Sequence, residues 1–116
     1  MIMQIVRIVI AAVTALLGLW VIIRPASIAS LTGISASGGR GRTEIRAAMG
    51  GFYLALGAAP IFFNSAEMFF LLGIAYLTVG IVRLVAMFVD KSVEASNLLN
   101  LATEAVFGVL LILPVG

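Results

Sequence analysis

Four stretches of about twenty predominantly apolar residues dominate this sequence of 116 residues. An α-helix needs about 20 apolar residues to cross a hydrocarbon core of about 30 Å, and each stretch is long enough. Only 10% of the residues are charged, against roughly 25% in a soluble domain, so the chain cannot cover its surface for water. We therefore expect an all-α fold, an integral membrane four-helix bundle that forms one domain over residues 1–116.

Residues that start or stop helices set the expected boundaries. Pro25 ends the first helix because its ring lacks an N–H group, and Thr43 suits the N-cap of the second. The connections after the second and third helices are short, which predicts antiparallel neighbours. In the longer loop 24–43, we expect an interfacial turn over 25–31 and a flexible Gly- and Ser-rich link over 35–42. The expected helices are 4–23, 44–63, 68–89 and 93–115.

The basic residues predict an orientation. One side of the membrane collects most of them, and the other side has only Arg7 and the amino terminus. Because cytoplasmic loops carry an excess of Lys and Arg, we expect loops 24–43 and 90–92 in the cytoplasm and both termini outside. The basic residues on the expected cytoplasmic side are Arg24, Arg40, Arg42, Arg46 and Lys91.

Composition excludes several kinds of chemistry. The chain has no cysteine and no histidine, which removes thiol catalysis, haem axial histidine and the usual zinc and copper ligand sets. The net charge of +2 is too small to indicate nucleic-acid binding. We expect no cofactor, no metal site, no catalytic residue and no nucleic-acid partner.

Polar and small residues recur every three or four positions, so each expected helix carries them on one face. In lipid such faces turn inward, because small residues let helix backbones approach each other. At 1.5 Å per residue, Tyr53 and Glu104 lie about 14 to 15 Å from the cytoplasmic helix ends. We predict an intramembrane polar cluster, a candidate ligand-binding site in the cytoplasmic half of the bundle, made of Glu44, Arg46, Tyr53, Arg83, Asn97, Asn100 and Glu104.

Two interpretations of this cluster stay open. Two arginines and two glutamates sum to zero charge, as in a structural network between helices. Alternatively, the arginines and asparagines line a cavity for an anionic or amphipathic ligand, with Glu104 binding a proton. Arg83 points either toward Glu104 or back toward the interface, and without a cation beside it Glu104 would be protonated.

Residues 41–47 read Gly-Arg-Thr-Glu-Ile-Arg-Ala and are followed by paired glycines at 50 and 51. This segment resembles the Gly-Arg-x-Glu-x-Arg-Ala…Gly-Gly signature of an uncharacterised bacterial family of four-helix membrane proteins, a domain of unknown function. Arg83 and Glu104 also look like that family's pattern, whereas Met49 stands where an aromatic residue is expected. The resemblance implies a location in the bacterial cytoplasmic membrane, but it implies no reaction and no ligand.

Two classes of function follow. The first is a structural or accessory subunit of a larger membrane complex or of a homo-oligomer. The second is a binding or transport module for a lipid, a quinone-like amphiphile or protons, built on the Arg and Glu cluster. An intramembrane enzyme would need Glu104 and Tyr53 within hydrogen-bond reach, roughly 2.6 to 3.2 Å. Membrane lipids are expected contacts in every case.

Overall fold

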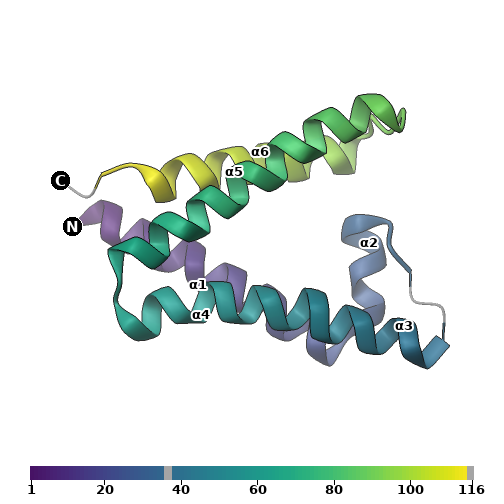
Figure 1. Cartoon of the computed structure of the whole chain (residues 1–116), viewed down its shortest axis with the longest axis horizontal. Coiled ribbons are helices and arrows are strands. Elements are labelled where there is room, and N and C mark those ends of the chain that lie inside the picture. The colour runs from purple at the N-terminus through teal and green to yellow at the C-terminus, as the bar shows by residue number, and fades with distance from the viewer. Residues whose placement is uncertain (36–37, 115–116) are drawn as a thin grey trace. The chain divides into compact units, whose positions relative to one another are not determined.

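The computed structural model describes residues 1–35 and 38–114 and contains only helices in this part of the chain (Figure 1). Four helical stretches are long and apolar enough to cross a membrane: Ile2–Ile23, Gly38–Phe63, Ala66–Val89 and Ala95–Ile112. The predicted fold class is therefore confirmed. The elements are α1 (Ile2–Ile23), η1 (Pro25–Ser27), α2 (Ile28–Thr32), α3 (Gly38–Glu44), η2 (Ile45–Gly51), α4 (Phe52–Phe63), α5 (Ala66–Val89) and α6 (Ala95–Ile112).

The first and third expected spans match α1 and α5 to within two residues at each end. The segment after Pro25 forms the short helices η1 and α2, and its location at the membrane interface stays a prediction. The turn before α5 is also as expected: Asn64 ends α4 in the left-handed conformation, at φ 48°. Ser65 then caps α5 by accepting a hydrogen bond from the Met68 amide at 3.3 Å. Helix α6 is shorter than the expected 93–115, of which residue 115 lies outside the described residues.

The flexible link expected over 35–42 is wrong from Gly38 onward, because a helix begins there rather than at Glu44, and residues 36–37 of that link lie outside the described residues. Thr43 is not an N-cap, since its hydroxyl donates to the Gly39 carbonyl oxygen at 3.1 Å within the helix. Gly38 has φ +75° and marks the start of the helix. Three glycines made the segment look flexible, but it contains no proline, and Arg40 and Arg42 are good helix formers.

A second unpredicted feature is the π-helical segment η2, which joins α3 and α4 into one continuous helix. In a π-helix each turn holds more residues than in an α-helix, so the faces of the helix shift relative to a 3.6-residue period. Arg46 and Tyr53 therefore do not follow the simple spacing that placed them on one face.

The chain forms two compact units. Unit 1 contains residues 1–7 and 65–116, and unit 2 contains residues 8–64. In unit 1, α5 and α6 lie side by side and antiparallel (Figure 1). A Cβ on Gly73 would lie 2.8 Å from the Leu111 Cβ and 3.1 Å from the Gly108 carbonyl oxygen, so these glycines set the close approach of the two helices. The prediction of a single domain stays a prediction.

In unit 2, α1 packs against η2 and α4, where Gly18 of α1 lies against the backbone of Gly50 and Leu54. A Cβ added to Gly57 would overlap the Ala11 carbonyl oxygen and the Ala15 amide nitrogen, so the backbones are in direct contact there. Near the other end, Val21, Ile28 and Ile45 form a buried apolar cluster that anchors α2. Small residues and close helix packing thus hold this unit together.

Gly57 and Gly51 provide a matched test of this packing. Gly57→Ala forces α1 and α4 apart and should lower the free energy of unfolding by about 1–3 kcal/mol. Gly51→Ala adds a methyl group that meets no atom of unit 2 within 4 Å, so its higher helix propensity should keep stability equal or raise it. Thermal unfolding of both variants in the same detergent measures the difference. Equal midpoints would contradict the close approach of α1 and α4.

Candidate functional site

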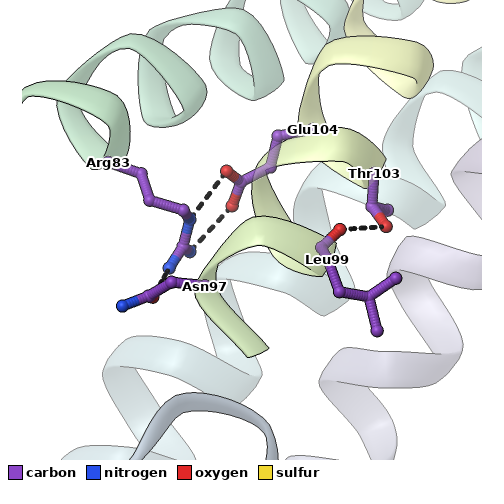
Figure 2. Close-up of polar contacts among 5 residues, drawn as sticks. All are labelled: Arg83, Asn97, Leu99, Thr103 and Glu104. Atoms are coloured by element: carbon purple, nitrogen blue, oxygen red, sulfur yellow. Dashed lines mark hydrogen bonds and ion pairs between the residues drawn. The ribbon is translucent and has the colours of Figure 1, made fainter. Parts of the chain in front are cut away.

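The centre of the candidate site is an ion pair between Arg83 of α5 and Glu104 of α6. Arg83 Nε donates to Glu104 Oε1 at 2.8 Å, and Arg83 Nη2 donates to Glu104 Oε2 at 2.8 Å (Figure 2). This two-point geometry is the strong arrangement of a guanidinium with an ionised carboxylate. Of the two directions expected for the Arg83 side chain, the one toward Glu104 is correct.

Asn97 extends the ion pair into a small network. Its Oδ1 accepts a hydrogen bond from Arg83 Nη1 at 3.0 Å, and its Nδ2 donates to the Ser92 carbonyl oxygen at 2.8 Å. Ser92 belongs to the connection between α5 and α6. The network therefore ties the guanidinium of α5 to the carboxylate of α6 and to the backbone of the turn between them.

Local sequence explains why these side chains meet. Asn97 and Glu104 are seven residues apart, two turns of α6, and so share the face toward α5. Gly80 precedes Arg83 by three residues on α5, and a Cβ built there would lie 3.5 Å from the Glu104 Cβ. The Gly80 position thus lies directly against Glu104, on the helix face that carries Arg83.

The ion pair is only partly buried. The Glu104 side chain is 11% exposed, and that of Arg83 is 24% exposed. Beside Arg83 lies an open pocket of about 410 Å³ within unit 1. Its polar lining consists of Thr78, Arg83, Asp90, Ser92 and Asn97, and its apolar lining consists of Val79, Val82, Ala86 and Met87.

The remaining predicted site residues are less closely connected. Asn100 is half-buried on α6 and also takes part in an interaction. Glu44 and Arg46 are exposed, and Tyr53 is half-buried, all three in unit 2. The structure thus brings together Arg83, Asn97 and Glu104, and the convergence of the unit 2 residues with them stays a prediction.

Sequence reasoning left Arg7 out of the candidate site, although it lies on the face of the first helix that was expected to turn inward. Arg7 is 4% exposed, and its Nη2 donates to the carbonyl oxygen of Leu113 at 2.6 Å. Leu113 follows α6 directly, so the cation lies at a helix carboxyl end, where the helix dipole favours positive charge. The position of Arg7 on the same face as buried Thr14 was the available signal.

Four helices that are long and apolar enough to cross a membrane indicate a small membrane protein, and its described residues include an ion pair between two of these helices. The family model Domain of unknown function (DUF4345) matches residues 2–114, and the chain belongs to that family. The predicted membership of an uncharacterised family is thereby confirmed. No curated protein and no solved structure matches the chain.

Glu104→Gln tests the energetic role of the ion pair. It leaves the Arg83 guanidinium without its carboxylate, and we expect a loss of about 1–3 kcal/mol in the free energy of unfolding. Thr103→Val is the matched control on the same helix, because the Thr103 hydroxyl bonds only within α6, to the Leu99 carbonyl oxygen at 3.0 Å (Figure 2). Its effect should stay within about 0.5 kcal/mol. Equal losses in a denaturant titration would refute a stabilising ion pair.

Proposed function

We propose that this protein is a binding module for a small amphiphile of the membrane, which occupies the pocket beside Arg83. The observation that carries the proposal is the composition of that pocket, in which five polar residues and four apolar residues line one volume of about 410 Å³. Ligand sites commonly have volumes of about 300–1,000 Å³, with a few polar groups on a largely apolar wall.

The length of the pocket, and the change from polar to apolar residues along it, favour an amphiphile over a small polar solute as the ligand. Its lining on α5 extends from Thr78 to Asp90, a length of roughly 18 Å at 1.5 Å per residue. Val79 and Val82 in the apolar part are exposed side chains of a helix apolar enough to span a membrane. A polar head group would lie by Asp90 and Ser92, and an apolar chain would lie along Val79 and Val82.

Filling the pocket tests this proposal. Ala86→Phe places a ring among the lining residues, whereas Val85→Phe, one position earlier on an exposed face, leaves the pocket open. We expect the wild type and Val85→Phe to retain a bound lipid through mild-detergent purification and Ala86→Phe to lose it, as measured by native mass spectrometry. Equal lipid retention by all three proteins, each eluting as a folded species, would rule out the pocket as the binding site.

A second proposal is a structural or accessory subunit of a membrane complex or a homo-oligomer. The observation that favours it is the direct pairing of Arg83 with Glu104, since a network whose partners satisfy each other holds helices together without a ligand. This role requires a stoichiometric protein partner or a second copy in the native membrane, and the Ala86→Phe substitution would leave that assembly intact.

We further propose that the protein lies in a bacterial cytoplasmic membrane with both termini outside and loops 24–43 and 90–92 inside. The excess of basic residues in these loops supports the orientation. Because the chain has no cysteine, a variant with one introduced cysteine carries a single reactive thiol at a known position. In intact cells, the thiol of Lys91→Cys should not react with a membrane-impermeant maleimide. A cysteine inserted directly after Met1 should react with the same reagent. The reverse labelling pattern would contradict the orientation.

A further inference from the structure

The charges around the pocket do not balance. The Arg83 guanidinium is matched by the Glu104 carboxylate through two hydrogen bonds at 2.8 Å. Asp90 also lines the pocket, and among the described residues it forms no ion pair. The pocket lining therefore carries a guanidinium that Glu104, outside the lining, already neutralises, and one further carboxylate for which the lining offers no second cation.

The position of Asp90 strengthens this imbalance. Asp90 is the C-cap of α5, and its amide donates to the Ala86 carbonyl oxygen at 2.8 Å. The carboxyl end of a helix carries a partial negative charge, so an acidic side chain is unfavourable there. The helix end and the Asp90 carboxylate act in the same direction, and both favour a cation in the polar part of the pocket.

We propose that the pocket selects an amphiphile whose head group carries a primary ammonium, and that Asp90 binds this ammonium. An anionic head group, which the sequence suggested, would meet the Asp90 carboxylate without an unmatched arginine to compensate. A bare inorganic cation would need several ligating groups, and no cluster of three acidic residues lies in the described part of the chain. A bare cation would also make no use of the apolar wall formed by Val79, Val82 and Ala86.

The inference rests on the proposed function and specifies its ligand class. An ammonium group has three N–H donors, and a carboxylate accepts such bonds strongly. Ser92 and Asn97 line the same end of the pocket and provide further polar groups for the head group. A partly exposed ion pair contributes about 0.2–1 kcal/mol, so a preference of up to about fivefold over a head group without an ammonium N–H is expected.

The test uses the full-length protein in nanodiscs of phosphatidylethanolamine, phosphatidylglycerol and phosphatidylcholine in equal amounts and with identical acyl chains. Native mass spectrometry then measures which lipid stays bound. We expect the wild type to retain phosphatidylethanolamine over the other two by about two- to fivefold. Asp90→Asn should abolish the preference while keeping lipid bound. Glu94→Gln, an exposed acidic position outside the pocket lining, should keep the preference.

The outcomes separate the two claims. If Ala86→Phe loses lipid but the wild type retains all three lipids equally, the pocket binds lipid and the ammonium selection is wrong. The same holds if Asp90→Asn keeps the wild-type preference. If Ala86→Phe retains as much lipid as the wild type, the proposed function itself fails, whatever the head-group preference.

Discussion

A charged side chain within a membrane span is costly, by about 2.5–3.5 kcal/mol at the centre of a helix, unless another group of the protein compensates it. Arg83 and Glu104 meet this constraint together, since each lies on a helix apolar enough to cross a membrane and the other is its partner. Two parallel hydrogen bonds at 2.8 Å fix both the distance and the register of α5 against α6. The glycines Gly73 and Gly108 permit the close approach along the same helix pair. The packing of unit 1 and the position of its ion pair therefore depend on each other.

The same pairing determines what the neighbouring pocket can bind. Because Glu104 occupies the guanidinium of Arg83, the arginine does not act as an unmatched cation toward a ligand. Asp90, at the carboxyl end of α5, then makes the polar part of the pocket negatively charged. The proposed amphiphile follows from this distribution of charge and from the apolar wall that continues along α5. A structural role for the ion pair and a binding role for the pocket are compatible, since the ion pair joins Arg83 to Glu104 and the proposed head group would meet Asp90.

Much of the helical structure was predictable from residue spacing and capping. The four apolar stretches, the turn at Asn64 and Ser65 and the shared face of Asn97 and Glu104 follow from helix periodicity and capping. Three features did not follow. The glycines before Arg42 favoured a loop, yet no residue there prevents a helix, and local sequence does not reveal that the helix starts at Gly38. The π-helical segment changes the face of every residue after Ile45. The contact of Arg7 with Leu113 joins residues 106 positions apart, which no local pattern contains.

The most direct measurement of the central claim is solid-state NMR of the protein in lipid bilayers, with ¹⁵N in the arginine side chains and ¹³C in the glutamate carboxyl groups. Arg83→Lys and Glu104→Gln samples assign the signals. The account predicts strong dipolar coupling between the Arg83 guanidinium nitrogens and the Glu104 carboxyl carbon, together with the chemical shift of an ionised carboxylate. Absence of that coupling, or the shift of a protonated acid at Glu104, would contradict it.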